Sequence, residues 1–144
     1  MKTVFLTTLI IIFSFGCVSP IVQRLTNEEI ENAINKAKSS KLIVLDIYHN
    51  RCKTCKYIEP VIEELKLKYE KNKDIVFLKY DLSNPFTIND SMKIAKELGL
   101  EKIYRSQRYS GIVLFIDTKT KEVIKELVAE YDIKRYEDII NGHA

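Results

Sequence analysis

Residues 42–60 read LIVLDIYHNRCKTCKYIEP, and this stretch decides the fold. Its first seven residues, 42–48, are apolar except for Asp46 and are rich in the β-branched and aromatic residues of a buried strand. From Cys55 onward the apolar residues recur every three or four positions, which predicts an amphipathic helix. The cysteine pair Cys52 and Cys55 therefore lies where a strand ends and a helix begins.

This position predicts a reactive thiol. The free N–H groups and the macrodipole at a helix N-terminus stabilise negative charge, so we expect a lowered pKa for Cys52. Arg51, Lys53 and Lys56 add positive charge that acts in the same direction. Cys52 is then the nucleophile, Lys56 assists it by favouring the thiolate, and Cys55, one turn further along and more buried, is the resolving thiol.

Asp46 is a carboxylate inside an apolar strand, where removal from water is costly. Its pKa should therefore rise, and a carboxylate of this kind near a dithiol can relay the proton of the resolving cysteine. The alternative is an ordinary surface residue on an edge strand. Pro60 lies inside the predicted helix, where it removes a backbone hydrogen bond and bends the axis.

The spacing of these residues resembles the active-site segment of the thioredoxin family. Asp46 lies six residues before Cys52, the core reads CKTCK, and Pro60 lies five residues after Cys55. The resemblance implies a thioredoxin-like α/β fold, with a mixed central sheet of about four strands flanked by helices on both faces. It also implies a monomeric thiol–disulfide oxidoreductase that needs no cofactor beyond a redox-active Cys52–Cys55 disulfide.

The chain departs from the family pattern before its third core strand. Members typically carry a cis-proline there, which holds an extended backbone against the substrate and shields the dithiol from metals. The corresponding residue here is Ser110 or Gly111, and no proline follows Pro85. We therefore expect Tyr109, Ser110 and Gly111 to contact the substrate, together with Arg51, which replaces the usual tryptophan before the first cysteine.

The rest of the chain supplies the expected scaffold. Thr26 and Glu29 form a predicted capping box at the start of the first helix. The segment 100–111 has no readable pattern. The further expected elements are a strand over 75–82, a helix capped at Thr87 with Asp90 and ended by Gly99, a strand over 112–116, a hairpin partner over 122–128, and a last helix capped by Asp132 and stopped by Gly142.

Residues 1–17 resemble a bacterial export signal of the lipoprotein type. Lys2 provides a positive start, an apolar run follows, and the segment ends in Gly16-Cys17. We predict a signal over 1–16, a tether over 17–25 that begins at a lipidated Cys17, and one thioredoxin-like domain over 26–144. An ordinary signal peptide, an uncleaved anchor and a buried first strand are the alternatives.

Composition limits the remaining possibilities. The chain has 144 residues, of which 46% are hydrophobic, enough for one domain with a core. A net charge of +3 with mixed signs argues against a nucleic-acid-binding surface. Lipidation of Cys17 would leave Cys52 and Cys55 as the only pair of the three cysteines. Export would place that pair outside the cytosol, in the periplasm or at the cell exterior, where disulfides persist.

The dithiol also has less active interpretations. It could be a structural disulfide, although a short ring stabilises little, or half of a metal site to which His49 could add one ligand. It could also be the remnant motif of a redox-inactive or metal-binding interaction module. The favoured function is reduction or isomerisation of disulfides in exported proteins, with a membrane or periplasmic electron-transfer partner. The cations near Cys52 would instead favour a more oxidising pair, so the direction of electron flow stays open.

Overall fold

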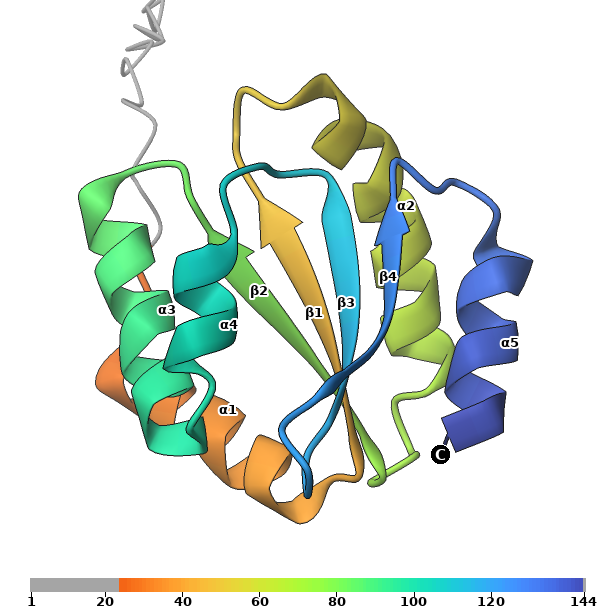
Figure 1. Cartoon of the computed structure of the whole chain (residues 1–144), viewed down its shortest axis with the longest axis horizontal. Coiled ribbons are helices and arrows are strands. Elements are labelled where there is room, and N and C mark those ends of the chain that lie inside the picture. The colour runs from red at the N-terminus through yellow and green to blue at the C-terminus, as the bar shows by residue number, and fades with distance from the viewer. Residues whose placement is uncertain (1–23, 144) are drawn as a thin grey trace, which may run out of the picture.

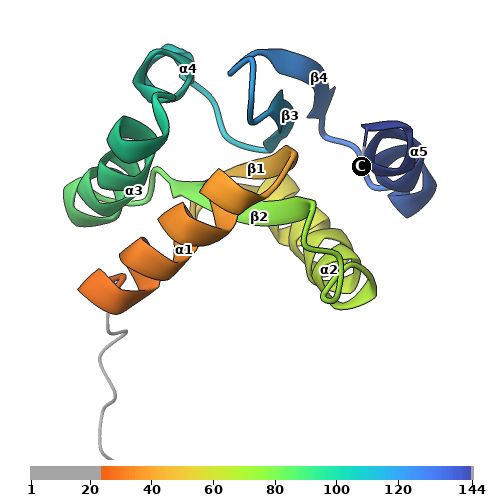
Figure 2. The ribbon, with the colours of Figure 1, turned by 90° about the horizontal axis from the view of Figure 1, so that it is seen from below.

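The computed structural model describes residues 24–143, which form a four-stranded sheet between two helical layers (Figures 1 and 2). The sheet has the order β2-β1-β3-β4; β1 is parallel to β2 and antiparallel to β3, which is antiparallel to β4. The strands are β1 (Leu42–Tyr48), β2 (Ile75–Asp81), β3 (Ile112–Asp117) and β4 (Val123–Val128). The helices are α1 (Asn27–Ser39), α2 (Lys53–Lys68), α3 (Pro85–Leu98), α4 (Glu101–Ser106) and α5 (Ile133–His143).

This architecture confirms the predicted mixed sheet with helices on both faces. The predictions made for residues 1–17, including lipidation of Cys17, lie outside the described residues. No helix within residues 24–143 is long and apolar enough to cross a membrane.

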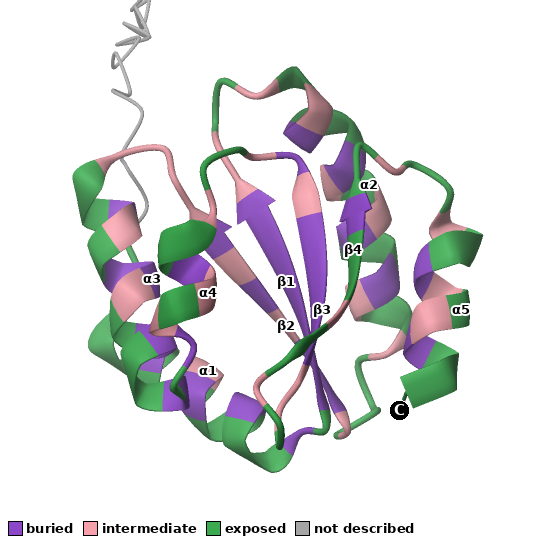
Figure 3. Ribbon diagram, viewed as in Figure 1, coloured by how far each residue is buried: buried purple, intermediate pink, exposed green. Residues whose placement is uncertain are grey.

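Alternate residues of β1 divide the core into two clusters, because successive side chains of a strand point to opposite faces. Ile43, Leu45 and Ile47 pack with apolar residues of α1, α3 and α4. Leu42 and Val44 pack instead with residues of α2 and α5. Asp46 shares their parity and therefore points to the α2 side of the sheet. Figure 3 shows that β1 and β3 are the most completely buried strands.

The start of α1 agrees with prediction, but the start of α3 does not. The Thr26 hydroxyl accepts the N–H of Glu29, whose carboxylate accepts the N–H of Thr26, so the predicted capping box is confirmed. The α3 helix begins two residues before the predicted cap at Thr87. Asn84 caps it by accepting the N–H groups of Phe86 and Thr87. Proline at the first helical position is already set in the helical conformation, which favours this earlier start.

In the carboxyl half of the chain, one prediction is confirmed and two elements differ from expectation. Gly99 ends α3 in the left-handed conformation as predicted, with φ of 70°. The segment with no readable pattern then forms α4, a six-residue helix that is held by burial of Leu100 and Tyr104 rather than by an apolar stripe. At the far end, α5 continues to His143, so Gly142 lies inside the helix and does not stop it.

Candidate active site

Cys52 is the N-cap residue of α2, at the end of the loop that leaves β1. Its sulfur accepts the backbone N–H of Cys55 at 3.1 Å, and its own N–H donates to the His49 carbonyl at 3.0 Å. Cys52 is half-buried and Cys55 is only 1% exposed. The Sγ atom of Cys55 lies 3.9 Å from the Ile47 carbonyl. A partner can therefore approach the first sulfur, while the second lies beneath it.

The two thiols differ in acidity in the direction expected of a nucleophile and a resolving thiol. Burial opposes ionisation of Cys52, but hydrogen bonds with the side chains of Cys55 and Ser110 and with the backbone N–H groups of Cys55 and Thr54 lower its pKa. Burial, followed by the hydrogen bond with Cys52, raises the pKa of Cys55 to about 11. The hydrogen bonds to Cys52 thus lower its pKa more than burial raises it.

Asp46 is 4% exposed and lies on β1, which has β2 on one side and β3 on the other. The alternative of a surface residue on an edge strand is therefore wrong. Its Oδ1 atom is buried and has no hydrogen-bond partner among the described residues. Burial raises the pKa of Asp46 to about 6, although the positive charges of Lys79 and Lys66 oppose the shift.

Gly111 brings the segment before β3 against the dithiol. Its φ is +81°, a conformation that side-chain-bearing residues rarely adopt. A Cβ atom on Gly111 would lie 2.8 Å from Cγ2 of Thr54 and 3.6 Å from Sγ of Cys52. The N–H of Gly111 donates to the Ile47 carbonyl at 2.9 Å, and its carbonyl accepts the N–H of Ala129 at 3.0 Å. This residue therefore joins the ends of β1 and β4 directly beside Cys52.

We expect Gly111→Ala to lower the free energy of unfolding by about 3 kcal/mol, because positive φ and overpacking act together. Gly99→Ala is the matched control, since Gly99 also has positive φ but has no atom within 4 Å of the added Cβ. Gly99→Ala should lower the free energy of unfolding by only about 1–2 kcal/mol. Chemical denaturation measures both changes. Thr54→Ser removes the nearest methyl group, so Gly111→Ala should lower the free energy of unfolding less in a Thr54→Ser background. An equal loss in both backgrounds would contradict this contact.

The other predicted site residues lie at the rim. Arg51, Lys56 and Tyr109 are exposed, Tyr109 to 78%, and Ser110 is half-buried. Ser110 is the only one of these four among the main influences on the pKa of Cys52. The proposed catalytic help from Lys56 and the substrate contacts of Arg51, Tyr109, Ser110 and Gly111 stay predictions.

Two residues that were not singled out from the sequence belong to the site. Thr54 fills the space beside Gly111. Lys79 is paired in register with Asp46, and its Nζ atom lies 3.4 Å from a Glu59 oxygen and 4.2 Å from the centre of the Tyr48 ring. The alternating pattern of residues 75–81 could have placed Lys79 on the same face as Asp46, but only the strand register brings the two together.

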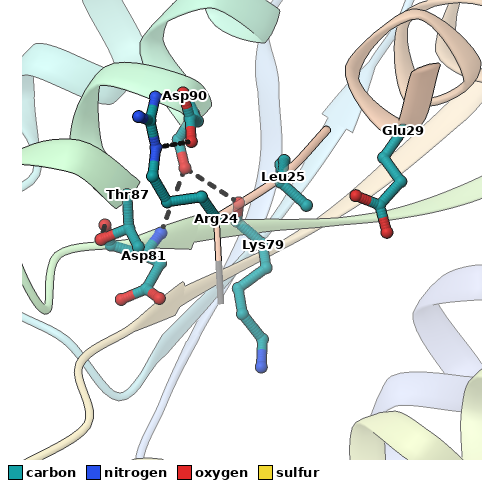
Figure 4. Close-up of a pocket in the computed structure, with 8 residues that line it drawn as sticks. Arg24, Leu25, Glu29, Lys79, Asp81, Thr87 and Asp90 are labelled. Carbon is teal, nitrogen blue, oxygen red and sulfur yellow. Dashed lines mark hydrogen bonds and ion pairs between the residues drawn. The ribbon is translucent and has the colours of Figure 1, made fainter. Parts of the chain in front are cut away.

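One hollow in the described part of the chain lies between the start of α1, the end of β2 and α3. A cavity of about 230 Å³ is lined in part by Arg24, Lys79, Asp81 and Asp90 (Figure 4). Arg24 forms two hydrogen bonds to Asp90, at 3.2 and 3.0 Å, and thereby attaches the chain before α1 to α3. Asp90, expected to help cap α3, is instead a buried partner of Arg24 and Lys93. Within residues 24–143, no group of three or more His, Cys, Asp or Glu side chains could hold a metal ion.

A dithiol at the start of a helix that directly follows a buried strand of a mixed sheet defines a thioredoxin-like domain. The thioredoxin family model matches residues 21–130, and the chain belongs to the thioredoxin family. Thioredoxin F2, chloroplastic, from Arabidopsis thaliana is 35% identical over 107 residues, covering 74% of this chain and 46% of the relative. Thioredoxin H4 from the same plant is 30% identical over 104 residues, covering 72% and 73%.

The chain spans about half the length of the first of these relatives. Among solved structures, Trxlp from Edwardsiella tarda has a TM-score of 0.51 at 15% identity, covering 81% of this chain and 94% of that one. The Schistosoma mansoni thioredoxin pre-protein in its reduced form has a TM-score of 0.50 at 22% identity, covering 81% and 90%. Similarity at this level shows that the fold is shared.

Proposed function

We propose that this protein is a thiol–disulfide oxidoreductase in which Cys52 is the nucleophile and Cys55 the resolving thiol. The observation that carries the proposal is the asymmetry of the pair. Cys52 caps α2 within reach of solvent and has a lowered pKa, whereas Cys55 is buried and its pKa is raised to about 11. An asymmetric dithiol of this kind suits stepwise exchange better than a structural disulfide.

The reaction proceeds in two exchanges. The Cys52 thiolate attacks one sulfur of a substrate disulfide, forms a mixed disulfide and releases the other substrate sulfur as a thiolate, which takes a proton. Cys55 then loses its proton and attacks Sγ of Cys52, which releases the second substrate thiolate. Two electrons pass to the substrate, and the protein is left with a Cys52–Cys55 disulfide. A dithiol electron donor must reduce this disulfide before the next turnover.

Asp46 is proposed to accept the proton of Cys55. With a pKa of about 6, Asp46 is mostly ionised at neutral pH, so it can act as a base. In the free dithiol, the hydrogen bond and the charge of Cys52 help to keep the pKa of Cys55 high. Both influences end when Cys52 enters a mixed disulfide, which makes the proton easier to remove at the step where its loss is required.

The test is catalysis together with a redox titration. The purified full chain, supplied with dithiothreitol, should accelerate reduction of a disulfide-bonded protein such as insulin and should form a reversible Cys52–Cys55 disulfide in redox buffers. A reduction potential near the roughly −270 mV of thioredoxin would indicate a reductase, and one near roughly −120 mV an oxidant. We favour reduction or isomerisation. Absence of both acceleration and a reversible disulfide would overturn the function.

We also propose that the protein works outside the cytosol on disulfides of exported proteins. The support is the charged start, apolar run and Gly16-Cys17 ending of residues 1–17. In this proposal Cys17 carries a lipid that holds the domain at a membrane, and a membrane or periplasmic carrier supplies electrons. Several relatives are named chloroplastic, so an organelle-targeting segment is the competing proposal.

Cys17→Ser separates these proposals. A lipoprotein should incorporate labelled palmitate in bacterial cells, and Cys17→Ser should abolish both the label and membrane association. Processing at the same place without any lipid would indicate an ordinary signal peptide instead. Import of a fluorescent fusion of residues 1–25 into isolated chloroplasts would support the organelle-targeting proposal.

A further inference from the structure

Two of the three segments that meet near Cys52 contain no acidic residue. Residues 49–58 and 102–116 carry six Lys and Arg residues and no Asp or Glu. The third segment, residues 129–132, lies beside Gly111 and Tyr57 and carries Glu130, which pairs with Arg135, and Asp132. We use the name cationic arc for Arg51, Lys53, Lys56 and Arg108, all of which are exposed. None of the four forms an ion pair with another residue in the described part of the chain. Their charge is therefore presented to solvent.

The fold brings the arc together around one sulfur. Arg51 and Lys53 flank Cys52 in sequence, and Lys56 lies one turn further along α2. Arg108 lies three residues before Gly111, whose added Cβ would be 3.6 Å from Sγ of Cys52. Three residues span at most about 10 Å. Figure 1 shows the β1–α2 and α4–β3 loops at the same end of the sheet.

The arc has a cost within the folded domain. Positive side chains are unfavourable at the positive N-terminal end of a helix dipole, and the first turn of α2 contains no acidic residue. The first turn of α1 carries Glu28 and Glu29, whereas α3 and α5, like α2, have no acidic residue there; α2 differs from α3 in placing Lys53 and Lys56 at its start. The lowered pKa of Cys52 depends mainly on hydrogen bonds, so that shift does not account for the lysines. An external negative partner would offset the unfavourable charge.

Two exposed aromatic side chains border the arc. Tyr57 is 68% exposed and Tyr109 is 78% exposed, and each is the residue immediately after a member of the arc. Tyrosine provides a large contact area with a polar end, which is useful at protein interfaces. The combination of cations and tyrosines fits a polypeptide better than a small anion.

We propose that the cationic arc selects protein substrates whose target disulfide is flanked by acidic residues. This inference rests on the proposed function and deepens it by naming the substrate class. Complementary charge raises the rate of encounter and holds the target sulfur near Cys52 before exchange. Because the four side chains are exposed, the preference should weaken as salt screens them.

The experiment compares three peptides that share one disulfide loop and differ only in flanking Glu, Gln or Lys residues. At low salt, the full chain should reduce the Glu peptide with a kcat/KM about ten-fold higher than the Lys peptide, within the range of electrostatic steering. At 0.5 M salt the ratio should approach one. Equal rates at low salt, or faster reduction of the Lys peptide, would overturn the inference.

Two triple variants test whether the preference for the Glu peptide comes from the cationic arc. Arg51→Gln, Lys53→Gln and Arg108→Gln combined should bring the Glu-to-Lys ratio near one. The matched control changes Lys38, Lys73 and Lys119 to Gln, three exposed lysines without ion pairs in the described structure and without contact with the dithiol. It should keep the ratio, and loss of preference in both triple variants would overturn a local arc. Failure to reduce any of the three peptides would overturn the proposed function itself.

Discussion

Cys52→Ser is expected to lower the rate of disulfide reduction by about 10³-fold or more, because it removes the nucleophile that begins the exchange. Cys55→Ser should also stop turnover, but at a later step. Its Cys52 can still attack a substrate disulfide, yet no second thiol remains to release the substrate. The dithiothreitol-driven reduction of a disulfide-bonded protein measures the first effect. Mass spectrometry of acid-quenched samples, prepared with reduced protein from which dithiothreitol has been removed, detects the trapped mixed disulfide.

The third cysteine provides a control for this pair. Cys17→Ser should leave reduction by the detergent-solubilised protein intact, because the dithiol lies at the start of α2 and does not include Cys17. A Cys52→Ser variant with normal turnover would contradict the assignment of the nucleophile. If Cys55→Ser formed no mixed disulfide with substrate, the order of the two thiols would be wrong.

Asp46→Asn is expected to stabilise the protein at neutral pH but not in acid. The pKa of Asp46 is raised from 3.8 to about 6, so the folded state binds a proton more tightly than the unfolded state. The resulting stability is fully present below about pH 4 and is lost as the pH rises through 6. The shift corresponds to about 3 kcal/mol, which is the expected gain of the variant above pH 7.

Denaturant unfolding from pH 4 to pH 8 measures this difference. Asp138→Asn is a control, because that carboxylate is exposed and pairs with Lys134 at the surface. The catalytic effect has the opposite sign. If Asp46 accepts the proton of Cys55, Asp46→Asn should slow resolution of a preformed mixed disulfide near pH 7. A constant gain in stability at every pH, with unchanged resolution, would contradict both roles of the carboxylate.

The sequence predicts the local part of the site well. Residues 42–60 specify a buried strand, a loop and an amphipathic helix through their own pattern, so β1, α2 and the position of Cys52 agree with expectation. The cap of α3 at Asn84 rather than at the predicted Thr87 is also a local feature, and Pro85 is the residue from which it could have been predicted. The helix α4 carries no such pattern, because burial of Leu100 and Tyr104 holds it.

The remaining features depend on tertiary structure. Gly111 and Thr54 lie close together although they are far apart in the chain, and no local sequence pattern predicts their contact. The position of Lys79 beside Asp46 follows from the register of two parallel strands. The two hydrogen bonds from Arg24 to Asp90 are another example, since a buried carboxylate on a helix does not identify its partner.

The division of the core by β1 has a consequence for how the protein can change over evolution. Ile43, Leu45 and Ile47 pack beneath α1, α3 and α4, whereas Asp46 and the start of α2 lie on the other face of the sheet. Substitutions more than about 7–10 Å apart that share no partner affect stability nearly independently, which holds for the parts of the two clusters away from β1. The α1–α3–α4 layer can therefore accumulate changes, or be redesigned to tolerate heat, while the residues around the dithiol stay under their own selection.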